Sequence, residues 1–391
     1  MPPLTVPDKE ENMAYPLTHI GPGALSRLGD VLDGFGTPSI FLVADADAYR
    51  LSGAEAVAAP ALQGRRLVRF DGFAANPRLV DAEKGLALFR RAPCDTLLAI
   101  GGGSAIDMAK LVGALAANDG PPAELATGKR PMHRHSPPLV AVPTTAGTGS
   151  EATHFAVVYV GGKKYSLAHP GLLPHTVLID PLLTATLPTA LTAHTGLDAL
   201  CQAIESLWSV NADAVSLADA RQALYLALRH LNAACLEPTP AARLGMCRAA
   251  HLAGRAINRS KTTAPHALSY SLTSGYGVPH GLAVALTLGA VLEYNAGVSP
   301  HDSTDPRGPE WTRYRLREIC AALGAADAAQ ARRAFTQRLQ ALGCPTRLGQ
   351  VGVDTPAQLE ELARTVNAER LGNNPRRLDA DSLVRLLATL A

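Results

Sequence analysis

Short apolar runs alternate with amphipathic stretches through the first half of the chain, and this rhythm constrains the fold most. Four runs of strand length are rich in Val, Ile, Leu or Phe: residues 39–44, 66–70, 96–100 and 138–142. Stretches with helical spacing lie between them, such as 77–91 and 104–118. Strands that are apolar at consecutive positions are typical of parallel sheets buried on both faces. We therefore predict a parallel, Rossmann-like α/β domain.

Two further strands are predicted at residues 155–160 and 176–180, and Gly161-Gly162 is predicted to form the bend of a hairpin. From about residue 189 the character changes, because the chain becomes rich in Ala and Leu at helical spacing and carries frequent prolines. We predict an all-α second domain, with the boundary near residues 181–188. The predicted domains are 1–185 and 186–391, and a chain of 391 residues is long enough for both.

Composition and charge exclude several classes of protein. The chain is 47% hydrophobic with a net charge of +2, which favours a packed globular protein and excludes strong attraction to nucleic acid or an anionic membrane. The six cysteines show no C-x-x-C spacing, as expected in a reducing compartment. The first residues contain prolines and charges instead of a signal-peptide core, and the longest apolar run, 282–292, is too short to span a membrane. We predict a cytoplasmic protein, with 282–292 in a buried helix.

A glycine-rich turn follows the strand predicted at 96–100. Gly101, Gly102, Gly103 and Ser104 stand directly before a predicted helix. Glycines let a ligand approach the backbone closely, and the N-terminus of a helix favours an anion such as a pyrophosphate. The alternative is an ordinary tight turn. The turn lacks the G-x-G-x-x-G spacing of the standard dinucleotide fingerprint.

A second loop, 143–151, follows the strand at 138–142 and is rich in Thr, Ser and Gly, which suit contacts with the phosphate and adenosine of a cofactor. Asp45 stands at the end of the strand at 39–44. Its carboxylate is suited to accept hydrogen bonds from a ribose and to repel a 2′-phosphate. Its alternative role is to cap the next helix.

Residues in the helical half suggest a metal site. Asp198 and Gln202 are four residues apart on a helix predicted to begin at Thr195, with Glu205 on the same stripe. His266 and His280 each follow a proline at a predicted helix start. A carboxylate and two imidazoles are sufficient for a catalytic divalent metal. Each of the twelve histidines could instead be structural, but the apolar setting of these two favours a partner for the ring.

Four motifs stand in the order and spacing of a known family: GGGSAIDMAK, PTTAGTGSEAT, TGLDAL followed by ES, and HAL followed by GVPHG. Over essentially its whole length the chain resembles the iron-containing (group III) alcohol dehydrogenases. The resemblance implies a dinucleotide-binding α/β domain followed by a helical metal-binding domain like that of dehydroquinate synthase. It also implies NAD(H) or NADP(H) as cofactor, Fe²⁺ or alternatively Zn²⁺ as metal, a small aldehyde or alcohol as substrate, and a homodimer.

Residue by residue, the resemblance assigns roles to these positions. The pyrophosphate turn corresponds to Gly101, Gly102, Gly103 and Ser104. Further cofactor contacts correspond to Thr144, Thr145, Thr153 and Lys164, and Asp45 matches the position that favours NAD over NADP. The metal ligands correspond to Asp198, His266 and His280. Gln202 departs from the histidine that is usual at the fourth ligand position; either three strong ligands suffice or metal binding is weakened, and we expect the former.

Tyr270 is a second departure, because many family members carry a histidine there. Its hydroxyl is able to donate a proton or a hydrogen bond to the substrate, and its alternative role is packing.

Within the family, residues 253–281, together with 205–212 and 367–378, look like the phosphonoacetaldehyde reductases. Arg255, Arg259 and Lys261 precede His266, and a second basic pair is Arg376-Arg377; either set could donate to a phosphonate. The alternative is a solvated helix face. We predict reduction of phosphonoacetaldehyde to 2-hydroxyethylphosphonate; a general short-chain alcohol or diol dehydrogenase and a dehydroquinate synthase-like lyase are the alternatives.

Overall fold

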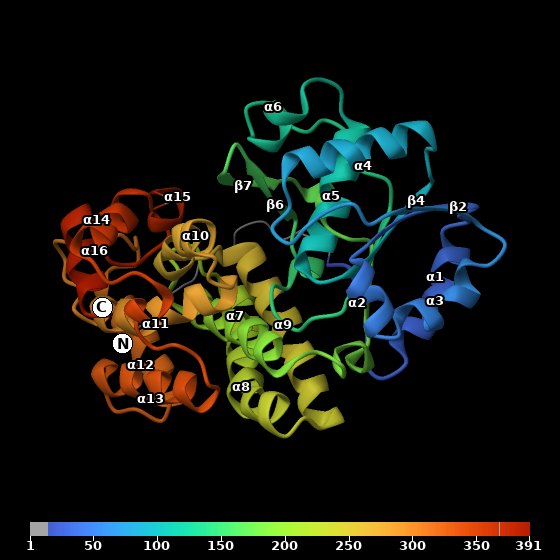
Figure 1. Ribbon diagram of the computed structural model, residues 1–391. Coiled ribbons are helices and arrows are strands. Elements are labelled where there is room, and N and C mark those ends of the chain that lie inside the picture. Colours follow the sequence, from blue (N-terminus) through green and yellow to red (C-terminus); the bar gives the residue numbers. More distant parts are fainter. Residues whose placement is uncertain (1–14, 367) are drawn as a thin grey trace. The chain divides into compact units, whose positions relative to one another are not determined.

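The computed structural model describes residues 15–366 and 368–391 (Figure 1). By their contacts these residues form two compact units. The sheet unit comprises 15–188 and 238–254, and the helical unit comprises 189–237 and 255–391. Helix α9 (Pro240–Ser260) contributes to both units. The division predicted from the sequence, 1–185 and 186–391, stays a prediction; its residues 1–14 lie outside the described chain.

The sheet unit contains a six-stranded sheet in the order β1-β8-β5-β4-β2-β3, and every neighbouring pair is parallel. The strands are β1 (Leu17–Ile20), β2 (Ser39–Ala44), β3 (Arg66–Phe70), β4 (Thr96–Gly101), β5 (Leu139–Pro143) and β8 (Thr176–Ile179). Both faces of the sheet are buried: Ile40 and Leu42 of β2 belong to one hydrophobic core, and Phe41 and Val43 belong to another. The predicted parallel α/β sheet is confirmed.

Helices cover both faces of this sheet (Figure 1). Helices α4 (Leu79–Arg91) and α5 (Gly103–Ala117) pack in the core that contains Phe41, and α1 (Leu28–Gly34) and α3 (Ala54–Leu62) pack in the core that contains Ile40. The remaining short elements are α2 (Ala46–Leu51), α6 (Pro122–Ala126), and the 3₁₀ turns η1 (Ala24–Arg27), η2 (Ser150–Ala152), η3 (Pro170–Leu172) and η4 (Pro181–Thr184).

Strands β6 (Phe155–Val160) and β7 (Lys163–Ala168) form a separate antiparallel hairpin. Gly161 and Gly162 connect them with φ values of 56° and 78°, which only glycine adopts at little cost, so the predicted bend is confirmed. Strand β1 was not predicted, because it is only four residues long and lies at the edge of the sheet.

The helical unit is built from helices, as predicted. They are α7 (Thr189–Trp208), α8 (Ala214–Leu236), part of α9, α10 (Ala264–Tyr276), α11 (His280–Ala296), α12 (Pro309–Ala322), α13 (Ala328–Ala341), the 3₁₀ turn η5 (Leu348–Val351), α14 (Pro356–Arg364), α15 (Ala368–Leu371) and α16 (Ala380–Ala388). The start predicted at Thr195 is wrong, because α7 begins at Thr189. The Thr195 hydroxyl donates to the carbonyl of Leu191 at 2.9 Å, a bond of the helix interior and not of a cap.

The apolar run 282–292 lies in α11 and is buried, as predicted. Within residues 15–366 and 368–391, no helix combines the length and the apolar character needed to cross a bilayer. All six cysteines are free thiols.

Candidate functional site

Three helices of the helical unit bring Asp198, His266 and His280 together. One potential ligand atom from each residue lies within 4.8 Å of the other two. Asp198 Oδ1 is 3.3 Å from His266 Nε2 and 3.9 Å from His280 Nε2. Asp198 and His266 are buried, whereas the side chain of His280 is 27% exposed. The two histidines, which lie 68 and 82 positions after Asp198 in the sequence, therefore meet it as predicted.

A close helix contact explains how His280 reaches this position. Gly281 follows His280 at the start of α11, and a Cβ built on Gly281 would lie 1.9 Å from the His194 carbonyl oxygen and 2.9 Å from Asp198 Cβ. Only a glycine lets the first turn of α11 approach α7 so closely. The absence of this one side chain places His280 beside Asp198.

A second carboxylate, Glu205, holds the other side of His266. Its Oε2 contacts His266 Nδ1, and its Oε1 accepts hydrogen bonds from the backbone N–H and the hydroxyl of Thr263, both at 2.8 Å. Burial lowers the pKa of His266, but Glu205 and Asp198 outweigh burial and raise this pKa to about 9. The sequence placed Glu205 on the correct stripe, but not in this orienting role, which is common around metal-ligating histidines.

The donor set of the trio fits a divalent metal ion. One carboxylate oxygen and two imidazole nitrogens are ligands that iron and zinc accept at about 2.0–2.2 Å from the ion. Ligands at that range lie roughly 3–4 Å from one another, and the distances from Asp198 Oδ1 to the two imidazoles fall there. Asp198, His266 and His280 are therefore able to hold the ion together.

Two predicted residues lie one helical turn from this trio. Gln202 follows Asp198 on α7 and is buried, and Tyr270 follows His266 on α10 and is partly buried. The ligand role of Gln202 and the catalytic role of Tyr270 stay predictions. Cys201 is buried nearby, and burial together with Glu205 and Asp198 raises the pKa of its thiol well above the usual value.

The glycine turn of the sheet unit joins β4 to α5. Gly102 is the N-cap residue of α5, and the first turn of this helix contains no acidic residue to neutralise the positive end of its dipole. Gly101 (φ 155°) and Gly103 are required by packing, because added Cβ atoms would lie 2.7 Å from Ala105 Cβ and 2.5 Å from Thr148 Oγ1 respectively. Packing inside the chain therefore accounts for two of the three glycines.

Gly102 is different. Its φ is −73°, and a Cβ there would make only ordinary contacts of 3.5 Å with the side chain of Thr145. Neither the backbone nor the packing requires glycine at this position. The missing side chain leaves room directly in front of a helix N-terminus, which is the space that a phosphate group would occupy.

The second predicted loop lies against this turn. The Thr144 N–H donates to the Gly101 carbonyl at 3.0 Å, and the Thr145 side chain is next to Gly102. The Ser104 hydroxyl accepts a hydrogen bond from the backbone N–H of Asn76 at 3.2 Å. The structure therefore brings Thr144 and Thr145 to the glycine turn, as their predicted cofactor roles require.

Asp45 caps α2, since its Oδ1 accepts from the Ala48 N–H at 2.8 Å. The alternative role of this residue, helix capping, is thus present. Asp45 also lies beside the glycine turn, because a Cβ on Gly101 would be 3.4 Å from Asp45 Cβ. A role in ribose binding stays a prediction.

Thr153 and Lys164 occupy different settings. Thr153 is buried, and its hydroxyl donates to the Ser150 carbonyl and accepts from the ammonium of Lys110, both at 3.1 Å. Lys164 lies on β7, opposite Tyr159 of the hairpin. Their predicted cofactor contacts stay predictions. Lys110 and Asp107, one turn before it, were not predicted from the sequence, although both are charged residues in an otherwise apolar helix.

The basic residues predicted to bind a phosphonate are held by carboxylates of the fold. Arg255 Nε donates to Asp219 at 3.0 Å, and Arg259 Nε donates to Asp213 at 2.6 Å. These ion pairs are what a structural role requires. Lys261 directly follows α9 and has a left-handed φ of 61°. Substrate contacts by Arg255, Arg259 and Lys261 stay predictions.

Arg376, in the second basic pair, is also held. Its Nε donates to Asp302 at 2.7 Å, and its guanidinium lies 4.1 Å from the ring centroid of Tyr294. Burial raises the pKa of Asp302, but the hydrogen bonds from Arg376 and Ser299 outweigh it and lower this pKa to about 2. Arg377 is exposed, and its backbone carbonyl accepts a hydrogen bond from the Tyr294 hydroxyl.

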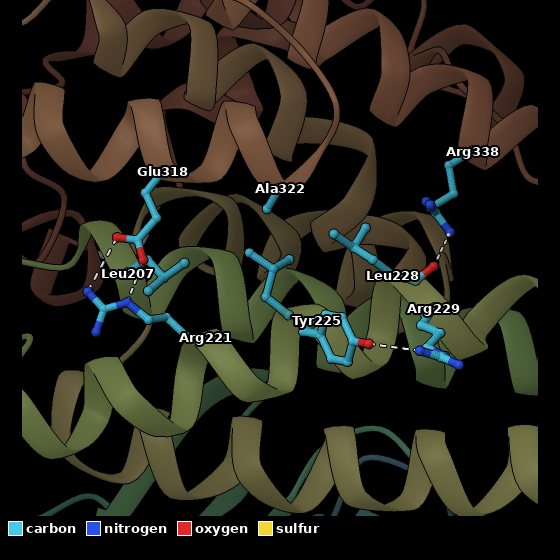
Figure 2. Close-up of a pocket in the computed structure, with 9 residues that line it drawn as sticks. Leu207, Arg221, Tyr225, Leu228, Arg229, Glu318, Ala322 and Arg338 are labelled. Atoms are coloured by element: carbon cyan, nitrogen blue, oxygen red, sulfur yellow. Dashed lines mark hydrogen bonds and ion pairs between the residues drawn. The ribbon is translucent and has the colours of Figure 1, made fainter.

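A groove of about 710 Å³ lies between α8, α12 and α13, and none of the residues predicted for the site lines it (Figure 2). Its charged groups are engaged with neighbours: Arg221 pairs with Glu318, and Arg229 donates to the Tyr225 hydroxyl at 2.8 Å. Arg338 donates to Asn232 at 2.7 Å. The groove therefore contributes no group to the metal trio or to the glycine turn.

Comparison with known families covers nearly the whole chain. Residues 16–181 match the model described as iron-containing alcohol dehydrogenase, and residues 192–391 match the C-terminal model of the Fe-containing alcohol dehydrogenase family. These matches confirm the resemblance drawn from the four sequence motifs.

Individual proteins that are similar to this chain are also dehydrogenases and reductases by name. A phosphonoacetaldehyde reductase of Streptomyces viridochromogenes is 39% identical over 323 residues, 80% of each chain. A 1,3-propanediol dehydrogenase of Klebsiella pneumoniae is 35% identical over 373 residues, 91% of this chain and 92% of its own. The crystal structure of sulfoacetaldehyde reductase from Bifidobacterium kashiwanohense in complex with NAD⁺ superposes with a TM-score of 0.86 at 30% identity, over 98% of this chain and 99% of that chain.

Proposed function

Because this chain belongs to the iron-containing alcohol dehydrogenase family, we propose that it reduces phosphonoacetaldehyde to 2-hydroxyethylphosphonate with NADH and a divalent metal ion. The broader activity, an NAD-dependent and metal-dependent alcohol dehydrogenase, follows from the family and from its named relatives. The observation that carries the proposal is the convergence of Asp198, His266 and His280 from three helices.

The proposed reaction would add a hydride to the carbonyl carbon and a proton to the carbonyl oxygen of the aldehyde. When bound, the metal ion acts as a Lewis acid toward the carbonyl oxygen, and the nicotinamide supplies the hydride. Asp198, His266 and His280 would hold the ion, and Glu205 fixes the ring of His266. Tyr270 is our predicted proton donor, with water or the cofactor ribose as the alternatives.

For the cofactor, Gly102 and the N-terminus of α5 are the groups we assign to the pyrophosphate, with Thr144 and Thr145 beside them. Asp45 at the end of β2 is the group we assign to the ribose, which would favour NADH over NADPH. The predicted homodimer and cytoplasmic location stay predictions.

The substrate class rests on two relatives. One is named for phosphonoacetaldehyde and the other for sulfoacetaldehyde, and both names describe a two-carbon aldehyde that carries an anionic group. Because Arg255 and Arg259 pair with Asp219 and Asp213, we argue the specificity from the two relatives and not from these arginines. A general diol or short-chain alcohol dehydrogenase is the second candidate, because a 1,3-propanediol dehydrogenase matches more of the chain.

A substrate panel separates these candidates. NADH oxidation by the metal-loaded enzyme is measured with phosphonoacetaldehyde, acetaldehyde and 3-hydroxypropanal. We expect kcat/KM for phosphonoacetaldehyde to exceed that for acetaldehyde by at least about a hundredfold, because a site that pairs with the anionic group leaves unpaired groups when the neutral aldehyde binds. Equal values would contradict the phosphonate specificity. Absence of steady NADH oxidation with every aldehyde would contradict the dehydrogenase and favour a lyase.

A further inference from the structure

Helix α5 carries a buried lysine surrounded by oxygen atoms. Lys110 is only 1% exposed, and its ammonium donates to the backbone carbonyls of Ser150 at 2.7 Å, Thr153 at 2.8 Å and Phe155 at 2.9 Å. The Thr153 hydroxyl lies 3.1 Å away. Three carbonyls match the three N–H groups of an ammonium. Lys110 thus occupies the place that a bound monovalent cation would take among backbone oxygens.

Asp107 holds the same segment one helical turn earlier. Its Oδ1 accepts from the Ser150 hydroxyl, and its Oδ2 accepts from the Val157 N–H at 3.0 Å. The two charged residues therefore hydrogen-bond to the segment 150–157 from its first residue to its last. We refer to Asp107 and Lys110 together as the α5 clamp.

Burying the clamp is unfavourable, which indicates that its hydrogen bonds matter. Burial lowers the pKa of Lys110 to about 8 and raises the pKa of Asp107. An apolar residue at position 110 would avoid this cost, but it would remove a charged hydrogen-bond donor from the carbonyls of Ser150, Thr153 and Phe155. The charged pair therefore adds specific hydrogen bonds to the apolar packing of β6 on α5.

The clamp lies on the helix that begins with the glycine turn, and the segment it holds continues directly from the loop 143–151. This loop touches the turn through the Thr144–Gly101 hydrogen bond and through the contact of Thr148 with Gly103. On its other side the loop packs on α9, where a Cβ on Gly149 would lie 2.4 Å from Gly254 Cα. The loop is therefore fixed from both sides.

We propose that Asp107 and Lys110 are positioning residues for the dinucleotide: by holding residues 150–157 on α5, they fix the loop 143–151 against the glycine turn before the cofactor binds. This inference rests on the proposed function, because these two loops are the proposed cofactor site. A loop ordered in advance loses less entropy on binding, so the clamp contributes to affinity without touching the cofactor.

Lys110→Met tests the proposal, with Lys110→Arg as the variant that retains the charge and Thr96→Val as the matched control. Thr96 is a buried residue at the start of β4, at the other end of this strand from the glycine turn, and its hydroxyl lies 2.7 Å from the hydroxyl of Thr37. NADH affinity is measured by fluorescence titration, with Tm, metal affinity and kcat at saturating NADH measured in parallel. We expect Lys110→Met to raise the Kd for NADH by at least about tenfold.

The pattern of effects distinguishes positioning from mere stability. Metal affinity should remain within about twofold of the wild type, kcat at saturating NADH should change little, and Lys110→Arg should recover part of the NADH affinity. Thr96→Val should lower Tm, because it removes the hydrogen bond to Thr37, and should leave the Kd for NADH unchanged. A folded Lys110→Met protein with the NADH affinity of the wild type would overturn the inference.

A second variant covers the case in which Lys110→Met does not fold. Asp107→Asn keeps the shape of the side chain and the ammonium of Lys110, but replaces an acceptor of the Val157 or Ser150 bond by a donor. Like Lys110→Met, Asp107→Asn should raise the Kd for NADH. An unchanged Kd would overturn the positioning role of the clamp and leave the proposed function standing. A wild-type protein that binds neither NADH nor NADPH would overturn the proposed function and the clamp with it.

Discussion

In the helical unit, side chains from three helices supply the donor atoms of the metal trio, and the loss of any one of them leaves the trio incomplete. In the sheet unit, the proposed cofactor loops offer mainly backbone and small residues, and two charged side chains of α5, Asp107 and Lys110, are buried in the clamp. The metal centre thus depends on the chemical identity of single side chains, whereas the proposed cofactor site depends on the conformation of its loops and on the absence of side chains at glycines. Substitutions should therefore have sharp effects in one unit and graded effects in the other.

The largest effect is expected at the metal centre. His266→Ala removes an imidazole that no neighbour replaces, so metal should be lost and kcat/KM should fall at least about a thousandfold, as removal of Lewis-acid catalysis worth several kcal/mol implies. Metal analysis and steady-state kinetics measure this. The Kd for NADH should stay within about twofold. A His266→Ala enzyme that keeps its metal and its rate would contradict the assignment.

Glu205 should show the next largest effect, because it orients His266 without belonging to the trio. We expect Glu205→Gln to weaken metal binding by about 10–100-fold, with activity recovered when excess metal is added. Competition with a chelator measures the affinity. Glu318→Gln, which breaks the Arg221 ion pair in the same unit, is the control and should leave metal affinity unchanged. Equal metal affinity in Glu205→Gln and wild type would remove the orienting role.

Substitutions at two neighbouring glycines distinguish a glycine needed for cofactor binding from a glycine needed for packing. Gly102→Ala should weaken NADH binding by roughly tenfold and leave Tm nearly unchanged, because its Cβ meets only Thr145 inside the protein. Gly103→Ala should instead destabilise the fold by about 1–3 kcal/mol, since its Cβ overlaps the Thr148 side chain. Fluorescence titration and thermal unfolding measure both variants. Unchanged NADH affinity in Gly102→Ala would contradict the pyrophosphate assignment.

The smallest effect concerns Asp302, whose ion pair gives Arg376 a structural role. The pKa of Asp302 is lowered from 3.8 to about 2, so its stabilising contribution is present above about pH 4 and is lost as the pH falls through 2. Asp302→Asn should lower the free energy of unfolding at pH 7 by about 1 kcal/mol, because this side chain is partly exposed to screening solvent.

Denaturant unfolding at several pH values checks this, and the difference between Asp302→Asn and wild type should narrow toward pH 3. The same variant should leave the KM for phosphonoacetaldehyde unchanged. A raised KM would indicate that Arg376 contributes to substrate binding.

The sequence predicted the features that depend on pattern and residue type. Consecutive apolar residues predicted β2 and β4, because strands buried on both faces have no polar side. The chemistry of carboxylate and imidazole, together with the family resemblance, predicted Asp198, His266 and His280. The sequence pattern did not predict β1, which has only four residues at a sheet edge. It also placed the start of α7 six residues too late, at Thr195.

The features that the sequence did not predict depend on contacts between residues that are distant in the chain. Asp107 and Lys110 follow the glycine turn in the sequence, and a charged pair three residues apart usually lies on a solvated helix face. Only the fold brings residues 150–157 over them. Arg255 and Arg259 show the same dependence, because their ion pairs with Asp219 and Asp213 join residues that lie 36 and 46 positions apart in the sequence. Their predicted contacts with a phosphonate stay predictions.

The most direct test of the metal centre combines metal content with activity in the wild-type enzyme. The purified protein is analysed for divalent metals, stripped with a chelator, assayed for aldehyde-dependent NADH oxidation, and reconstituted with Fe²⁺ or Zn²⁺. We predict that the stripped enzyme is inactive but still binds NADH, and that one of these ions restores the rate. Full activity in the metal-free enzyme would contradict a catalytic ion at Asp198, His266 and His280.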